Sequence, residues 1–570
     1  MRKRRLAGRD WRGWLLAAVL GFGVISSSAQ QTAPPAGATA QTGEQSKSLE
    51  GGGQKTGKHI THEQALQLFA LVDQLIKFSS DETGLPIKSE VKRQITDRAT
   101  VENYLKEKFA EDESAKRMQR GEIVLKKFGL LDRDFALSPF LLQLLKEQIE
   151  AYYDFKTKTV YMLDWVDIEE QKPVLAHELT HALQDQHSNL EKWNDQTPDQ
   201  VSLNYSDDTD HLARDEMDTA REAVVEGQAT AVMMDYVLKP MGKSLVKDPE
   251  LMDVLKQKMT SSEDSPVLAR APLLLSESLL FPYREGLSFE QDVWMDQGQT
   301  AAFTGTLDRP PTSSWEIINP REYEKRHVPS VPLLPNIHPL VDSLYKPYDI
   351  GQLGQLDMHI LAEIFGGDEA AANLTPAWDG GLYWAGQRLS AKTLAERAST
   401  NSIALFYLTV WKNAASAQAF TDLYIDNLGR KYSSVKLQSN SEGTHKAGLS
   451  QGVKVFPPPA QSSQDPDGSD ASALPGEQVY STSEGPVVIT TRDKMVFVSE
   501  SFPLDVARKL TAQILDAQGT GATRLAQTKP SEITAPKPVA LEPLTGNLVQ
   551  FFSDCGVMKA AVEAVMQAGR

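Results

Sequence analysis

The stretch from Val174 to His187 reads VLAHELTHALQDQH and contains the pattern His-Glu-x-x-His. On an α-helix, residues four apart share a face. His177 and His181 would therefore project side by side and could place two imidazole nitrogens on one Zn²⁺ at about 2.0–2.1 Å. Glu178 would lie about 100° round the helix, where it can reach a zinc-bound water instead of the metal. The motif predicts two histidine ligands and a general base, Glu178.

The surrounding residues support a helix over about 173–187. Pro173 suits the first position of a helix, where its missing N–H is not needed. One face of this helix would be largely apolar, and the opposite face would carry the histidines. The apolar face is formed by Leu175, Leu179, Ala182, Leu183 and Gln186, and the other by His177, His181 and Gln184. One face is therefore expected to be buried and the other to look into a cleft.

A third protein ligand is expected, because catalytic zinc usually takes three protein ligands and a water. Glu226 is the favoured residue. It lies in AVVEGQATAVMMDYVL, from Ala223 to Leu238, where the only charged residues are Glu226 and Asp235. A lone carboxylate in so apolar a helix would cost several kcal/mol to bury unpaired, and a metal partner removes that penalty.

Two other residues compete for the third position. Glu222 lies one turn before Glu226, and it could instead accept a hydrogen bond from a zinc histidine. His187 completes a His-Glu-x-x-His-x5-His spacing like that of the metzincins. Those enzymes need a glycine where Gln184 stands here, since a sharp turn carries their third histidine to the metal. The residues alone leave all three candidates open.

The segment His177-Glu178-Leu179-Thr180-His181, followed by Glu226-Gly227-Gln228-Ala229, resembles the gluzincin zinc metallopeptidases. HELTHALQDQ with a later VVEGQA is also similar to a group of bacterial exported HExxH proteins. The resemblance covers about residues 174–238. It implies an α+β, zincin-like catalytic domain with an active-site helix and a third-ligand helix, and hydrolysis of peptide or protein substrates. It also implies that His177, His181 and Glu226 bind Zn²⁺.

The chain departs from the thermolysin-like pattern in two places. The segment between His181 and Glu226 is longer, and Thr230 stands where those enzymes have an acid four residues after the zinc glutamate. The partner that orients a zinc histidine is therefore expected to be Glu222 or Asp215.

The rest of the reaction needs a cleft edge and an oxyanion donor. Two β-prone runs, 151–155 and 159–163, predict a hairpin just before the metal helix. In gluzincin-like folds such a strand borders the cleft, where an extended peptide can add as a strand. A Tyr, His or Arg should stabilise the oxyanion. The candidates, among which the sequence does not choose, are Tyr236, Tyr283, Arg284, His327 and Tyr348.

Composition narrows the possible partners and the metal chemistry. The chain has 570 residues, with 59 Lys and Arg against 76 Asp and Glu, giving a net charge of −17. Such a surface repels phosphate backbones, so nucleic acid is not an expected partner. Cys555 is the only cysteine, which excludes an internal disulfide and a cysteine-based metal site.

The N-terminus predicts an exported protein. Six Lys and Arg residues precede or border an apolar run from Trp14 to Ile25, and Ser27-Ser28-Ala29 offers small residues for cleavage before Gln30. The run is too short to cross a hydrocarbon core of ~30 Å comfortably. We expect a bacterial-type signal peptide over 1–29, a periplasmic or secreted mature chain, and no stable membrane span after cleavage.

The remaining organisation follows from breaks in composition. We expect a disordered leader over 30–58, the metallopeptidase domain over 59–384 and a C-terminal region of α/β or α+β type over 385–516. Low-complexity sequence interrupts that region at 457–477. Its expected elements are a helix over 402–428, a hairpin from 487–491 to 495–499 and a helix over 504–515. A linker over 517–548 and a terminal helix over 549–570 follow.

A different class of function fits the same motif. A periplasmic scaffold or binding protein could keep a zincin fold and a bound metal without proteolytic activity. Glu178 argues against this alternative, because a purely structural site needs no base.

Overall fold

The computed structural model describes residues 60–101, 103, 113–148, 151–193, 196, 204–259, 265–327, 330–440 and 473–519. The predicted signal peptide and leader, most of the 457–477 insert, and the linker and terminal helix beyond 519 lie outside these ranges. Within them, every helix is too short or too polar to cross a lipid bilayer.

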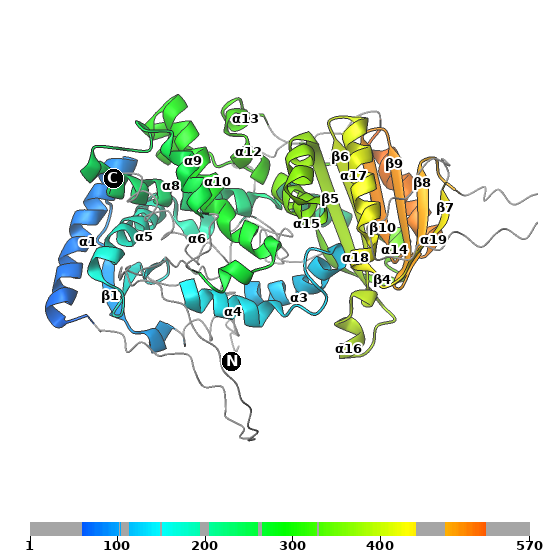
Figure 1. The fold of residues 1–570 in the computed structure, drawn as a ribbon, viewed down its shortest axis with the longest axis horizontal. Helices are drawn as coiled ribbons and strands as arrows, with labels where there is room; N and C mark the ends of the chain where they lie inside the picture. The colour runs from blue at the N-terminus through cyan, green and yellow to red at the C-terminus, as the bar shows by residue number, and fades with distance from the viewer. Residues whose placement is uncertain are drawn as a thin grey trace, which may run out of the picture.

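The first part of the described chain is mainly helical and lies on the left of Figure 1. Its elements are α1 (His62–Thr83), β1 (Lys92–Thr96), α3 (Glu113–Phe128), α4 (Leu137–Gln148), β2 (Ala151–Asp154), β3 (Thr159–Leu163), α5 (Ile168–Ser188), α6 (Leu190–Trp193), α7 (Tyr205–Arg214), α8 (Met217–Leu238), α9 (Leu251–Met259), α10 (Leu273–Gln297), a π-helix (Ala301–Gly305) and the short helices α11 (Thr306–Asp308), α12 (Ser314–Ile318) and α13 (Pro320–Glu324). The next short helix, α14 (His338–Val341), already packs against α19 (Leu504–Ala517) of the second part.

The second part is built on a large sheet, on the right of Figure 1. Its elements are β4 (Tyr345–Gln352), α15 (Gln355–Leu374), β5 (Trp378–Arg388), α16 (Leu394–Arg397), β6 (Ile403–Trp411), α17 (Ala414–Asp426), α18 (Leu428–Lys431), β7 (Val435–Asn440), β8 (Glu477–Thr482), β9 (Gly485–Arg492), β10 (Met495–Glu500) and α19 (Leu504–Ala517). The protein is thus of mixed helix and sheet, in agreement with the predicted α+β class.

Helix α5 lies at the centre of the helical part, packed against α1, α8 and β2. It begins at Ile168, earlier than predicted, because Asp167 caps it by accepting a hydrogen bond of 2.9 Å from the Glu169 N–H. Pro173 is therefore inside the helix, and the prediction that it starts the helix is wrong. The first turn of α5 is mostly polar, and the apolar periodicity begins after it. A prediction from apolar periodicity therefore places the start of the helix too late.

Helices α8 and α10 cross with their backbones almost in contact. A Cβ added to Gly227 would lie 2.4 Å from the carbonyl carbon and oxygen of Gly286, and one added to Gly286 would lie 2.1 Å from the Ala223 carbonyl oxygen. Only glycine leaves room for this approach. The crossing joins the helix that carries Glu226 to the helix that carries Tyr283.

A small sheet precedes α5 in the chain and has the order β1-β3-β2. Strands β2 and β3 pair antiparallel, with Tyr152 opposite Tyr161, so the predicted hairpin at 151–163 is confirmed. Strand β1 pairs with β3 in parallel, which leaves β2 at an edge of the sheet.

The large sheet has the order β4-β5-β6-β10-β9-β8-β7, and its neighbouring strands are antiparallel. The C-terminal region is therefore α+β and not α/β. The hairpin predicted at 487–499 is confirmed as β9 and β10, and the helix over 504–515 as α19. The boundary predicted at 384/385 falls inside β5, because the sheet already begins with β4 at Tyr345.

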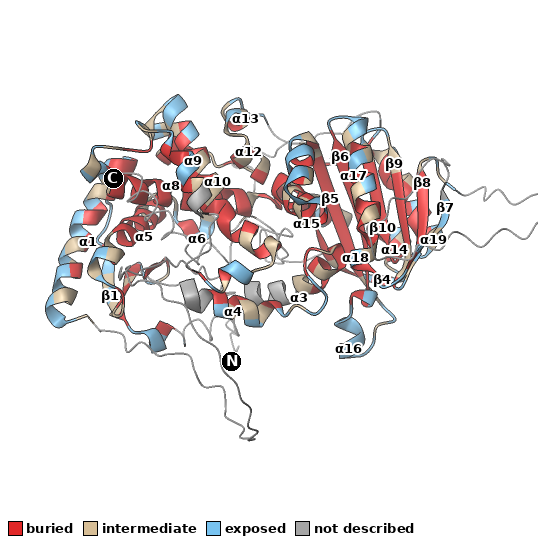
Figure 2. Ribbon diagram, viewed as in Figure 1, coloured by how far each residue is buried: buried red, intermediate tan, exposed pale blue. Residues whose placement is uncertain are grey.

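Helices cover both faces of this sheet. Helix α17 packs on one face and α19 on the other, so consecutive residues of β6 enter two different cores: Tyr407 lies with α17, and Phe406 with α19. Every residue of β6 is consequently buried, and β5 and β6 are red along most of their length in Figure 2. The helix predicted over 402–428 is confirmed only for α17, over 414–426, and is wrong for 403–411, because a strand buried on both faces reads as a continuous apolar run.

Buried charges connect the helical part to the large sheet. Lys127, at the end of α3, is fully buried and donates to Glu484 Oε2 and to Ser501 Oγ, each at 2.7 Å. Within the second part, Lys431 of α18 pairs with Glu500 of β10, and both side chains are fully buried. Removing one partner of such a pair would leave an uncompensated charge in the core, so the contacts of Lys127 tie the two parts together.

The glycine crossing generates a stability prediction. We expect Gly227→Ala and Gly286→Ala each to lower the free energy of unfolding by about 1–3 kcal/mol or more, because the added methyl group meets backbone atoms that cannot move aside. Gly121→Ala is the matched control, since its Cβ would meet nothing within 4 Å in helix α3. It should raise stability by about 0.4–1 kcal/mol. Chemical denaturation measures all three, and equal effects at Gly121 and Gly227 would contradict the close crossing.

Candidate metal centre

His177 and His181 lie one turn apart on α5 and point their Nε2 atoms at the same space. The two Nε2 atoms are 2.8 Å apart, and the rings are nearly perpendicular, with an interplanar angle of 82°. Both side chains are buried. The helix thus delivers two imidazole nitrogens to one point, which is the geometry that the i, i+4 spacing favours.

Glu226 reaches the same point from α8. Its Oε2 lies 3.1 Å from His177 Nε2, and its Oε1 lies 3.6 Å from His181 Nε2. The potential ligand atoms of the three residues all lie within 4.8 Å of one another. The side chain of Glu226 is fully buried. The structure therefore brings two nitrogens and one carboxylate together in the interior.

Burial shifts the pKa of each of the three groups toward its neutral form. Desolvation lowers the pKa of His177 well below its ordinary value, an effect that the neighbouring His181 increases, and it lowers the pKa of His181 as well. Both rings are therefore neutral and keep a lone pair for a metal. Desolvation also raises the pKa of Glu226 well above its ordinary value. A bound cation would offset that cost, because it stabilises the carboxylate form.

A chain of amides fixes the tautomer of His181. The Val225 carbonyl can only accept, so the hydrogen bond of 3.0 Å that it receives from Gln184 Nε2 sets the orientation of that amide. Gln184 Oε1 then faces His181 Nδ1 at 2.8 Å and must accept a proton from it. Nε2 of His181 is consequently the nitrogen with the free lone pair, and it is the one that faces Glu226.

The same chain continues away from the centre. Gln184 Nε2 also donates to Gln228 Oε1 at 2.8 Å, and Gln228 Nε2 donates to the carbonyls of Ala302 and Phe303 at 3.1 and 2.9 Å. These carbonyls belong to the π-helix, a conformation often found at functional sites. Because these carbonyls can only accept, the π-helix sets which group donates and which accepts in each hydrogen bond of the series that ends at His181. Neither Gln184 nor Gln228 was predicted in this role, although HELTHALQ places Gln184 three residues after His181.

Glu178 is buried beside the three ligands. Burial raises its pKa to about 7, and the neighbouring Glu226 adds to the rise, while a hydrogen bond with the backbone of Tyr153 partly offsets it. Tyr153 belongs to β2, the edge strand of the small sheet. A carboxyl group with a pKa near neutrality can both accept and return a proton. A cation at the neighbouring ligands would lower this pKa.

Tyr283 of α10 is the one oxyanion candidate that the structure brings to the centre. Its ring stacks near His177, with centroids 6.4 Å apart, and its hydroxyl contacts the Glu226 carboxylate. Three of the other candidates have different partners: Tyr236 packs edge-on against Phe78, Arg284 pairs with Glu277 and Glu285, and His327 pairs with Glu322.

The remaining predicted residues are placed as follows. His187 bonds Asp308 Oδ1 at 2.9 Å and lies outside the ligand group. Glu222 is buried next to Glu226, whose carboxylate it contacts. Asp215 accepts from the Gln352 N–H and pairs with His211, so the prediction that it orients a zinc histidine is wrong. His181 is oriented by an amide, not by Glu222 or Asp215.

The group formed by His177, His181 and Glu226 can therefore hold a metal ion. It combines imidazoles whose pKa is lowered with a carboxyl group whose ionised form a bound cation would stabilise, and Glu178 stands beside it without being part of it. No protein-family model, curated protein or solved structure matches the chain.

The amide chain generates a metal-affinity prediction. We expect Gln184→Leu to weaken Zn²⁺ binding about 10–100-fold, because His181 loses the acceptor that fixes its tautomer and ring orientation. Gln186→Leu is the control. It lies on the same helix, and its side chain bonds Lys88 and Ser89 on the surface, so its metal affinity should be unchanged. Titration against a competing chelator measures both, and equal affinities would rule out the orienting role of Gln184.

Proposed function

We propose that this protein is a zinc-dependent peptidase with a zincin-like catalytic domain. The observation that carries the proposal is the convergence of His177, His181 and Glu226, with Glu178 buried next to them. A structural metal site needs ligands alone, whereas a hydrolytic site also needs a base beside the metal. The proposed centre has both.

The donor set suits zinc. Two imidazole nitrogens and one carboxylate oxygen match the three-ligand arrangement of catalytic zinc, which leaves a coordination position for reactants. When bound, Zn²⁺ polarises the scissile carbonyl and makes a water molecule more acidic. His177, His181 and Glu226 would hold the ion, and the amide chain through Gln184 would keep His181 in the tautomer that binds it.

Glu178 is proposed as the general base. One of its carboxylate oxygens takes a proton from the attacking water as the new carbon–oxygen bond forms. The same group then gives that proton to the leaving amine nitrogen when the carbon–nitrogen bond breaks. Its buried position excludes bulk water, which would otherwise compete for the proton.

Strand β2 is the proposed guide for the substrate. It is an edge strand, packs against α5, and places the backbone of Tyr153 next to Glu178. An extended peptide that adds to such an edge would run past the base, because main-chain hydrogen bonds align it with the strand. The proposed substrates are therefore unfolded peptides or protein segments. Export to the periplasm or beyond, which rests on the N-terminal sequence alone, is part of the same proposal.

One observation favours the second candidate, a metal-binding scaffold without activity. The side chains of the three ligands are buried, as in closed structural sites. The two candidates separate in a cleavage assay. Zinc-loaded protein that never cuts a broad panel of unstructured substrates would support the scaffold.

The roles of Glu178 and Glu226 give the central test. Glu178→Gln should still bind about one equivalent of zinc, but its turnover rate should fall ~10²–10⁴-fold, since only the base is removed. Glu226→Gln should weaken zinc binding itself, because a neutral amide is a poorer ligand than a carboxylate. Metal titration and peptide hydrolysis are measured on the same preparations.

His187→Ala is the control for this set, because its ring bonds Asp308 away from the centre. Its zinc affinity and turnover should match those of the unchanged protein. Zinc binding that survives Glu226→Gln but is lost in Glu222→Gln would assign the third ligand to Glu222 instead. Loss of zinc in His187→Ala would favour the metzincin-like arrangement.

Tyr283 is proposed to hold the Glu226 carboxylate in place. Tyr283→Phe should therefore weaken zinc binding about 10-fold, with little change in the turnover of the zinc-loaded enzyme. Tyr236→Phe, on the side of α8 that faces Phe78, is the control and should change neither. If Tyr283→Phe instead lowers kcat ~10²–10³-fold at unchanged zinc affinity, Tyr283 is the oxyanion donor.

A further inference from the structure

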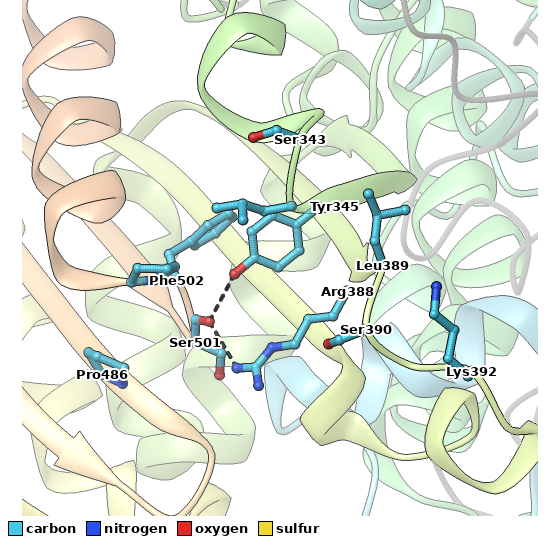
Figure 3. A pocket seen from close by; sticks show the side chains of 11 residues that line it. Ser343, Tyr345, Arg388, Leu389, Ser390, Lys392, Pro486, Ser501 and Phe502 are labelled. Atoms are coloured by element: carbon cyan, nitrogen blue, oxygen red, sulfur yellow. Dashed lines mark hydrogen bonds between the residues drawn. The ribbon is translucent and has the colours of Figure 1, made fainter.

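A pocket of about 630 Å³ opens at one end of the large sheet, in the part of the chain that holds no proposed metal ligand (Figure 3). It lies where β4 begins, β5 ends and the chain leaves β10. Its volume is within the range of sites that bind small molecules, about 300–1,000 Å³. Nothing in the proposed peptidase reaction uses it.

The wall of the pocket is apolar with a cationic side. Two aromatic residues, Tyr345 and Phe502, are buried in the wall, while Leu344 and Leu389 are 41% and 45% exposed at its edge. If apolar atoms of a ligand covered these two leucines, apolar surface would be removed from water, which is favourable.

The cationic side is formed by Arg388 and Lys392, and the lining contains no acidic side chain. The protein has a net charge of −17, yet both charged residues that line this pocket are cations. The pocket therefore favours a negatively charged ligand.

Arg388 is held in place before any ligand arrives. Its Nη2 donates to the carbonyls of Glu484 and Ser501 at 3.2 and 3.0 Å. The guanidinium carries five N–H donors in a planar fork, so these two bonds use only part of it. Figure 3 shows the guanidinium beside Ser501 at the base of the pocket. A fixed fork of this kind matches the two oxygens of a carboxylate.

Ser501 makes the base of the pocket rigid. Its carbonyl also accepts from the Tyr345 hydroxyl at 3.3 Å, its N–H donates to the Pro486 carbonyl at 2.8 Å, and its Oγ accepts from buried Lys127. Ser501 has a φ of 64°, a conformation that costs a non-glycine residue energy and that is enriched at binding sites. A preformed base lowers the entropy that a ligand loses on binding.

We propose that this pocket binds an organic carboxylate carried on an apolar chain, with the carboxylate on Arg388 and Lys392 and the chain along Leu344, Leu389 and Phe502. Two sources supply this chemistry: a peptide that ends in apolar residues with a free C-terminus, and a free fatty acid. The proposal does not depend on the peptidase function, because the pocket and the metal centre share no residue.

Calorimetric titration of the full chain tests the proposal with three probes: N-acetyl-Leu-Leu with a free carboxylate, its C-terminal amide, and octanoate. The free carboxylate should bind at least about tenfold more tightly than the amide, because charge-assisted hydrogen bonds are lost in the amide. Whichever of the dipeptide and octanoate binds with the lower Kd indicates whether the ligand is a peptide C-terminus or a fatty acid.

Variants then locate the binding. Arg388→Gln should weaken carboxylate binding at least about tenfold, and Lys392→Gln, whose side chain is exposed, about two- to fivefold. Lys346→Gln is the matched control, since this exposed lysine on β4 lies outside the lining, and its affinity should change less than about twofold. Lys392 keeps the test valid if Arg388→Gln fails to fold, because its side chain makes no structural hydrogen bond among the described residues.

Three results would overturn the proposal. Equal affinities for the carboxylate and the amide would remove the role of the cations. Unchanged carboxylate affinity in both Arg388→Gln and Lys392→Gln would place the binding elsewhere, including at the metal centre. No binding of any probe up to its solubility limit would show that the pocket takes no ligand of this class.

Discussion

The close crossing of α8 and α10 at Gly227 and Gly286 is the constraint on which the centre depends. It places the Tyr283 ring beside His177 and its hydroxyl against the Glu226 carboxylate. Because a helix is rigid over a turn or two, widening the crossing by one methyl group would move both side chains. The Gly of the Glu-Gly-Gln-Ala stretch therefore has a packing reason that is separate from the chemistry of the glutamate before it.

The interior around this crossing holds an unusual set of polar groups. Glu178, Glu222 and Glu226 are fully buried together with two histidines. Burial on this scale is expensive unless charge is compensated. Two features lower the free-energy cost of burying these groups. The amides of Gln184 and Gln228 provide a hydrogen-bond partner for His181 Nδ1. A cation bound by His177, His181 and Glu226 would neutralise the charge of the carboxylate. A metal ion bound by these three residues would therefore stabilise the folded state.

The large sheet contributes in a different way. Its ion pairs at Lys127 and Lys431 lie in the core, and the contact of Lys127 with Ser501 continues to the base of the apolar-cationic pocket. The helical part and the pocket are thus connected through buried groups that cannot move independently. A ligand in the pocket would meet a rigid wall, while the metal centre lies among helices at the other side of that junction.

The sequence by itself determined the local features. The i, i+4 spacing put His177 and His181 on one face, the apolar setting favoured Glu226 among three candidates, and β-prone runs joined by short turns predicted both hairpins, since each depends on residues close in the chain. Only the tertiary structure decided which distant groups meet. It brought the Tyr283 hydroxyl to the Glu226 carboxylate, placed Asp215 against Gln352 and His211, and made β6 a strand inside an apolar run that reads equally well as a helix. These outcomes depend on packing between elements, which local periodicity does not encode.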